Sequence, residues 1–196
     1  MSNRLSSLPM ATAGSPDDEG PWRLMERTSI RVAGSDDLDG VAAVLEDAGR
    51  FVHSLGIQAW PSGTFTEPEG WGRRQLHDAL RVAGLFVTEV DGEPAATVSL
   101  FEEDERFWPD AARDALYVHK LAVARRFGGL GLGRAMVEWS AGRAAAGGKR
   151  YLRLDCPRDD DALRRYYEQA GFVHRGDLTT RGFEASLYER DLVGRS

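Results

Sequence analysis

The most informative segment of the chain reads Leu121-Ala-Val-Ala-Arg-Arg-Phe-Gly-Gly-Leu-Gly-Leu-Gly-Arg134. Its pattern predicts a strand that runs into a glycine-rich loop, and a loop that runs into a helix. Glycines let a backbone approach a ligand closely, and a helix start leaves N–H groups unpaired at the positive end of the helix dipole. Arg125, Arg126 and Arg134 add positive charge at the same place. The segment therefore predicts an anion site suited to phosphate.

Two familiar phosphate motifs do not fit this loop. The P-loop requires Gly-x-x-x-x-Gly-Lys-Ser/Thr, but Gly133 is followed by Arg134 and Ala135. The dinucleotide fingerprint requires Gly-x-Gly-x-x-Gly, but Gly129, Gly131 and Gly133 alternate. A nucleotide-phosphate enzyme of either kind is therefore disfavoured, and a glycine-rich connector without a ligand remains the alternative to an anion site.

Hydrophobic periodicity on both sides of this segment predicts a sheet flanked by helices. Asp91-Gly92 lies between two apolar, β-branched runs and predicts a hairpin. Strands are expected over 29–32, 85–90, 95–101, 115–123, 151–154, 172–174 and 184–188. Helices are expected after Ser35, over 51–55 beyond a break at Gly49, and over 73–82, 131–146 and 159–170, with Leu132, Ala135, Met136, Trp139 and Ala146 of the 131–146 helix facing inward. This order predicts an α/β (α+β) sandwich with a mixed sheet.

Length and composition favour one globular domain. The chain has 196 residues, of which 42% are hydrophobic, and no apolar run is long enough for a transmembrane helix. Residues 1–27 lack periodicity and are expected to form a flexible tail, with Trp22 and Met25 as apolar exceptions, before a domain over 28–196.

Charge and cysteine content narrow the partners and the compartment. The net charge is -6, which argues against nucleic acid as a partner. One cysteine, Cys156, and no secretory signal pattern predict a cytoplasmic protein without a membrane partner. We expect Cys156 to be a packed thiol, because no base partner is visible near it. A homodimer is left open.

The opening segment resembles the GNAT superfamily of N-acetyltransferases. The family signature is a strand, then Gln/Arg-x-x-Gly-x-Gly/Ala, then a helix, and the match here is Gly128-Gly-Leu-Gly-Leu-Gly133. The first position departs, because the family usually has Gln or Arg there. A second feature, Tyr166-Tyr-Glu-Gln-Ala-Gly-Phe172, looks like the family's Tyr-Glu-x-x-Gly-Phe. The resemblance implies a mixed, mostly antiparallel central sheet flanked by helices, with the strands over 115–123 and 151–154 splayed apart.

The resemblance also implies acetyl-coenzyme A as co-substrate and no metal. In the family, loop amides hold the pyrophosphate, and the splayed strand pairs with the pantetheine arm. Carried over, the cofactor-binding residues are Leu121, Ala122, Val123, Arg126, Gly128, Gly129, Gly131, Gly133 and Arg134. The family often has Asn early in the next helix, where this chain has Asp160, and that departure leaves one cofactor hydrogen bond unassigned.

Acetyl transfer to an amine needs a group that protonates the leaving thiolate and a group that takes the amine's proton. Tyr167 matches the family's tyrosine that acts as the general acid, with packing as its alternative role, and Tyr166 is expected to pack. Some family members have a Glu that acts as the general base at the position where this chain has Tyr117. His119 lies on the same strand face and is the expected base, unless its role is structural.

The acidic run Glu102-Glu-Asp-Glu105 is the other candidate for proton removal, acting through water. It could also attract a cationic acceptor, or be a solvated turn. Loop aromatics at Trp60, Trp71, Phe107 and Trp108 line an acceptor pocket or form a satellite core.

The leading function is acetyl transfer to a primary amine of a small molecule or peptide. A non-catalytic acyl-coenzyme A-binding regulatory module is the alternative, and the missing strand carboxylate at Tyr117 is the feature that favours it.

Overall fold

The computed structural model of the protein describes residues 28–57, 60–180 and 182–193. The expected tail over 1–27, with Trp22 and Met25, lies outside the described residues. The described strands form one sheet in the order β1-β2-β3-β4-β5-β7-β6. Their bounds are Ile30–Val32, Leu85–Val90, Glu93–Phe101, Ala115–Val123, Tyr151–Pro157, Val173–Thr180 and Phe183–Asp191 for β1 to β7. All neighbouring pairs are antiparallel except β4 and β5, so the predicted mixed, mostly antiparallel sheet is confirmed.

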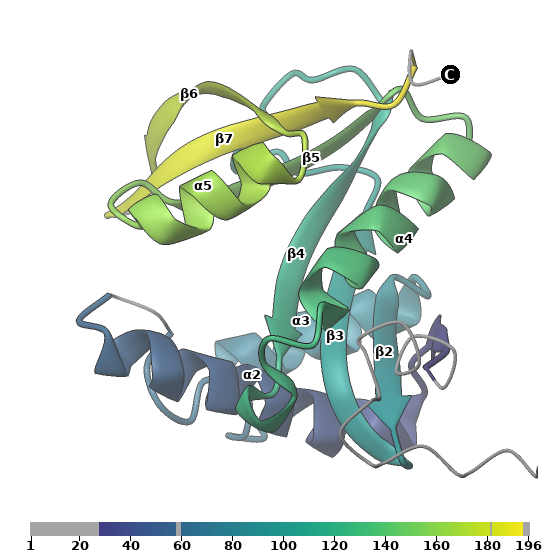
Figure 1. Ribbon diagram of the computed structural model, residues 1–196, viewed down its shortest axis with the longest axis vertical. Coiled ribbons are helices and arrows are strands. Elements are labelled where there is room, and N and C mark those ends of the chain that lie inside the picture. Colours follow the sequence, from purple (N-terminus) through teal and green to yellow (C-terminus); the bar gives the residue numbers. More distant parts are fainter. Residues whose placement is uncertain (1–27, 58–59, 181, 194–196) are drawn as a thin grey trace, which may run out of the picture.

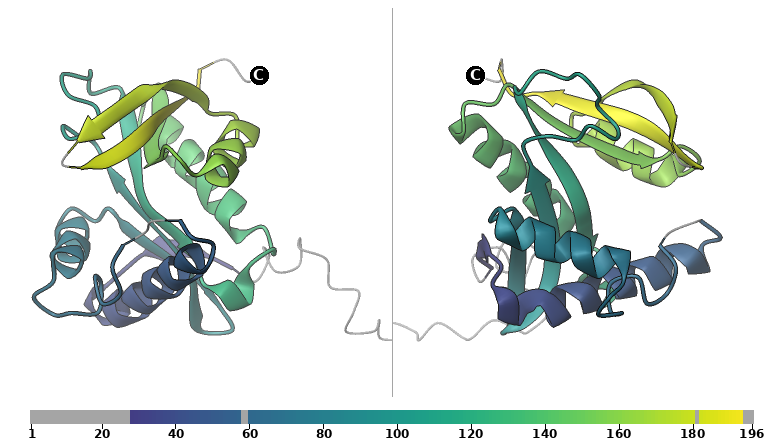
Figure 2. Two further views of the ribbon diagram at one scale, coloured as in Figure 1. Left: turned by 90° about the vertical axis from the view of Figure 1, so that its left-hand side faces the viewer. Right: turned by 180° about the vertical axis from the view of Figure 1, so that it is seen from behind.

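Helices cover both faces of this sheet (Figures 1 and 2). They are α2 Leu38–Ser54, α3 Trp71–Arg81, α4 Leu132–Ala146 and α5 Asp161–Gln169. One core cluster joins α2 and α3 to the first face, and a second cluster joins α4 and α5 to the opposite face. Among the described residues, no helix is long and apolar enough to cross a membrane.

The hairpin predicted at Asp91-Gly92 is confirmed. Asp91 has φ 54° and Gly92 has φ 81°, and these left-handed conformations let β2 and β3 pair across a tight turn. The dipeptide was a reliable signal because few residues other than Gly, Asn and Asp tolerate positive φ.

Three details of the element prediction were wrong. The helix does not break at Gly49, because that residue is buried where an added Cβ would lie 3.7 Å from the Trp60 ring, and packing outweighs the low helix propensity of glycine. The strand expected over 172–174 runs to Thr180, with a register shift between His174 and Gly176 that hides its alternation. Ala146, expected to face inward, is exposed at the end of α4.

The pair of β4 and β5 opens midway along its length. The two strands pair from Ala115↔Tyr151 to Val118↔Leu154, yet β4 continues to Val123 and β5 to Pro157. Figure 1 shows the two strands diverging from there. The expected splay is therefore present, and the β5-facing edge of β4 is unpaired along 119–123.

Candidate functional site

The glycine loop presents backbone amides at the start of α4. Gly129 and Gly131 both have φ 81°, a conformation that other residues rarely adopt. The first hydrogen bond of α4 runs from the N–H of Ala135 to the carbonyl of Gly131 over 3.0 Å. The N–H groups just before Ala135 therefore have no intrahelical acceptor, as an anion site requires. Apart from the adjoining residues of the chain, no described residue lies within 4 Å of a Cβ added at Gly129 or Gly131, so the described part of the chain leaves the space over the loop open.

Three other predicted contacts of the loop are already engaged within the chain. The N–H of Gly128 donates to the carbonyl of Arg125. Arg126 pairs with Glu93 at 2.5 Å. The Arg134 guanidinium contacts Glu138 and donates to the carbonyl of Gln169, so its contribution to an anion site is its backbone amide.

Tyr167 lies on the α5 face of the sheet, beside the splay. Its side chain is buried among the rings of Tyr166, Phe172 and Tyr188. Burial raises the pKa of its hydroxyl far above the ordinary value, with a smaller contribution from Cys156, so the hydroxyl keeps its proton. Tyr166, expected to pack, has a buried hydroxyl with no partner among the described residues.

Two neighbouring residues have structural roles. Cys156 is buried and unbridged, and burial raises the pKa of its thiol to about 12, so the expected packed thiol is confirmed. Asp160, which stands where the family often has Asn, accepts a 2.9 Å hydrogen bond from the N–H of Leu163 and caps α5.

His119 belongs to a cluster of three ionisable side chains on the opposite face. Its Nε2 lies 3.1 Å from a carboxylate oxygen of Asp104, which follows β3, and Asp155 of β5 completes the group within 4.8 Å. Burial raises the pKa of Asp155 to about 6, with Asp104 adding to the shift and His119 opposing it. We call Asp104, His119 and Asp155 the carboxylate–histidine cluster. It can hold a proton, and its donor atoms would also suit a divalent cation.

This cluster joins the two candidates for proton removal, because Asp104 comes from the acidic run and contacts His119 directly. Sequence reasoning missed Asp155, since it lies 36 positions from His119 and only the paired strands bring them together. Tyr117, at the position of the absent Glu, is buried, and its hydroxyl accepts a 3.0 Å hydrogen bond from Arg153.

Lys120 was also missed by sequence reasoning. Strict strand alternation would place it on the face opposite His119, but a bulge between β3 and β4 gives Lys120 φ 52° and turns it toward the α2–α3 connection. Its Nζ lies 5.5, 5.6 and 5.8 Å from the ring centres of Trp60, Phe65 and Trp71. Burial lowers the pKa of this amine to about 8.

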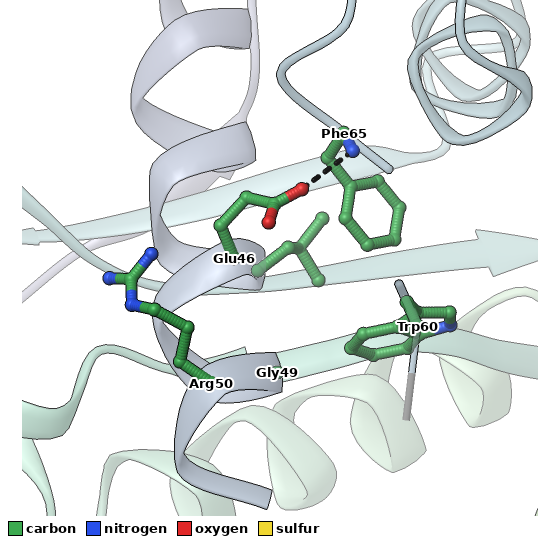
Figure 3. Close-up of a pocket in the computed structure, with 6 residues that line it drawn as sticks. Glu46, Gly49, Arg50, Trp60 and Phe65 are labelled. Atoms are coloured by element: carbon green, nitrogen blue, oxygen red, sulfur yellow. Dashed lines mark hydrogen bonds between the residues drawn. The ribbon is translucent and has the colours of Figure 1, made fainter. Parts of the chain in front are cut away.

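Two of the four loop aromatics, Trp60 in the α2–α3 connection and Trp71 at the start of α3, lie beside Lys120. Trp60 and Trp71 pack on Phe65 around Lys120, which matches a satellite core. Beside Phe65, the carboxylate of Glu46 accepts a hydrogen bond from the N–H of Phe65 (Figure 3). It accepts another from the N–H of Gly63. These bonds fix the loop, and the cavity there, about 10 Å³, has room for little more than a water molecule.

A larger hollow lies over the acidic run. It has a volume of about 330 Å³ and is lined by Glu102 to Glu105, Asp110 and the rings of Trp108 and Tyr117. Asp104 thus belongs both to this hollow and to the carboxylate–histidine cluster. Phe107 is buried against Phe183 instead.

Comparison with known proteins gives consistent matches. Residues 52–172 match the family model described as "Acetyltransferase (GNAT) family". A curated Bacillus subtilis (strain 168) relative, "Uncharacterized N-acetyltransferase YesJ", is 30% identical over 163 residues, which cover 81% of this chain and 87% of the relative.

Solved structures match the fold at lower identity. A GNAT-family acetyltransferase from Listeria monocytogenes superposes with a TM-score of 0.67 at 22% identity, covering 84% of this chain and 94% of the other. The yncA protein of Salmonella typhimurium, solved with its cofactor acetyl-CoA, has a TM-score of 0.62 at 17% identity and covers 86% of this chain and 96% of its own.

Proposed function

Because the chain belongs to the GNAT acetyltransferase family, we propose that this N-acetyltransferase moves an acetyl group from acetyl-coenzyme A to a primary amine of a small molecule or peptide, by direct attack of the amine. The presence of acetyl-CoA in the yncA structure supports the choice of donor. The alternative of a non-catalytic binding module is disfavoured, since groups able to give and to take a proton both stand at the splay.

The described residues fit acetyl-coenzyme A. Three features favour binding of this co-substrate: backbone amides without an acceptor at the start of α4, open space above Gly129 and Gly131, and the unpaired edge of β4. When bound, this co-substrate supplies the acetyl group as a reactive thioester. The chain's own part is to bind it through Leu121 to Val123 and the loop amides.

Proton removal falls to His119. Its 3.1 Å contact with Asp104 orients the ring, as an orienting carboxylate does for a general base. Most amines reach the enzyme as cations, and the acidic hollow that shares Asp104 favours cations. The acceptor is therefore drawn in as an ammonium and loses its proton at His119.

Proton donation falls to Tyr167. Adjacent residues of β5 point to opposite faces, so Asp155 joins the carboxylate–histidine cluster while Cys156 packs on the side of Tyr167. The proposed acid and base thus lie on opposite faces of the sheet, on either side of the splay. This arrangement is the observation that carries the proposal.

The test is turnover of an amine panel by the wild type and by Tyr167→Phe, followed by thiol release and by the mass of the product. Loss of the hydroxyl should lower kcat by about 10²–10⁴-fold, the usual contribution of a positioned acid. Affinity for acetyl-coenzyme A should hardly change, because the ring remains. Full activity in Tyr167→Phe would reduce this residue to a packing role, and no product with any amine would contradict the proposed reaction.

A further inference from the structure

The chain contains two lysines, Lys120 and Lys149, and their surroundings differ sharply. Lys149 lies on the surface, where its ammonium pairs with Glu102 at 3.3 Å and donates to the carbonyl of Arg113 at 3.2 Å. Lys120 is enclosed by three aromatic rings, and its amine has no hydrogen-bond or ion-pair partner within the part of the chain that the structure describes. The Lys149 amine is therefore held by an anionic partner, whereas the Lys120 amine lies against aromatic rings alone among the described residues.

The backbone at Lys120 explains its position. A positive φ is uncommon outside glycine and is retained where the surroundings impose it, often at functional sites. Here it sets the Lys120 side chain between His119, the proposed base, and Leu121, the first residue proposed to contact the donor. The side chain thus starts from the unpaired edge of β4, and its amine lies among the rings of Trp60, Phe65 and Trp71.

We infer that Lys120 is a self-modification site, whose amine takes the acetyl group when no external acceptor is present. The inference rests on acetyl-coenzyme A being the donor of the proposed function. It goes beyond that function because the acceptor is part of the chain itself.

The charge state of Lys120 supports this role. Burial lowers its pKa to about 8, against the opposing effects of Asp155 and Asp104 and with a smaller contribution from Arg106. An ordinary lysine has a pKa of about 10.4. Near pH 8, about half of the Lys120 side chains are therefore neutral and nucleophilic.

The transfer needs no reactant other than acetyl-coenzyme A and the Lys120 amine. The neutral Lys120 nitrogen forms an amide bond with the acetyl carbon, and the carbon–sulfur bond of the thioester breaks. The sulfur leaves as thiolate with the bonding electron pair and is protonated by Tyr167. The proton lost by nitrogen passes to the carboxylate–histidine cluster. Because an amide is far less reactive than a thioester, the product is a lasting modification that removes a positive charge from the acceptor side.

The experiment incubates the full chain with acetyl-coenzyme A alone and maps acetylation by peptide mass. A lysine-specific protease has two cleavage sites in this chain, so acetylation of Lys120 removes one of them. We expect one acetyl group on Lys120 of the wild type and of Lys149→Arg, and none at position 120 in Lys120→Arg. Labelling should rise about tenfold per pH unit below pH 8 and level off above it.

Gly131→Glu, which blocks the donor loop, distinguishes transfer within the site from reaction with free donor in solution. Loss of Lys120 acetylation in this variant supports the inference. Equal labelling of Lys120 in this variant, or acetylation confined to Lys149 and the N-terminal amine, overturns it. Transfer to external amines is scored separately, so an enzyme that acetylates the panel but never Lys120 retains the proposed function and loses this inference.

Discussion

The contact between His119 and Asp104 makes a specific prediction for the pH dependence of turnover. At saturating acetyl-coenzyme A, the rate should rise with pH as the base loses its proton. In His119→Ala the rate should no longer rise with pH. Its kcat should be lower by about 10²–10⁴-fold, the usual contribution of a positioned base. A steady-state pH profile of both proteins is the measurement.

Asp104→Asn is the matched control, since it keeps the shape of the carboxylate and removes its charge. Without that charge the ring loses its orienting carboxylate, so kcat should fall, while the rising limb should remain because the imidazole is still present. Asp155 and Lys120 stay in place in both variants. A rising limb that persists in His119→Ala would transfer the role of base to the acidic run.

At this scale the sequence was informative where a motif fixed a residue's place. Tyr167 and His119 could be proposed because the family pattern and strand alternation assign them to the splay. Asp155 and Lys120 were not, because their placement depends on tertiary structure. One requires the β4–β5 pairing, and the other a bulge that reverses the direction of its side chain.

At the scale of elements, the junction of β4 and α4 carries a prediction about donor affinity. Gly131→Glu places a carboxylate in the open space over the loop amides, where the phosphates are expected. Affinity for acetyl-coenzyme A, measured by calorimetry, should collapse.

Gly131→Ala separates charge from backbone strain. Both variants force a side chain onto a residue with φ 81°, at a cost of about 1–2 kcal/mol in the free energy of unfolding. The alanine variant should therefore lose similar stability but retain much more affinity. Equal affinity in wild type and Gly131→Glu would remove the loop from the donor site.

Element boundaries were predictable only where local chemistry dominates. Asp91-Gly92 located a hairpin because its backbone conformation is encoded in two residues. Gly49 misled because α2 is stabilised by what it packs against, including the Trp60 ring, and a local propensity cannot report that.

At the scale of the whole molecule, the splay divides the strands of the sheet into two groups. β1 to β4 lie on one side and β5, β7 and β6 on the other, and the strand pairing between them covers only Ala115–Val118 with Tyr151–Leu154. Helix α4 also connects the two groups, because its buried face contacts β3, β4 and β5 (Figure 1). A ligand that fills the splay would contact both parts and stabilise them together.

Acetyl-coenzyme A should therefore raise the unfolding temperature of the whole domain. A ligand that binds only the folded state adds about 2.7 kcal/mol to the free energy of unfolding when its concentration is 100-fold above Kd. Thermal melts of the wild type should shift upward with donor concentration, and those of Gly131→Glu should not. Hydrogen exchange should slow most in the peptide that contains residues 119–123, whose edge is unpaired without ligand. A rise in melting temperature with protection elsewhere, and none along β4, would place the donor outside the splay.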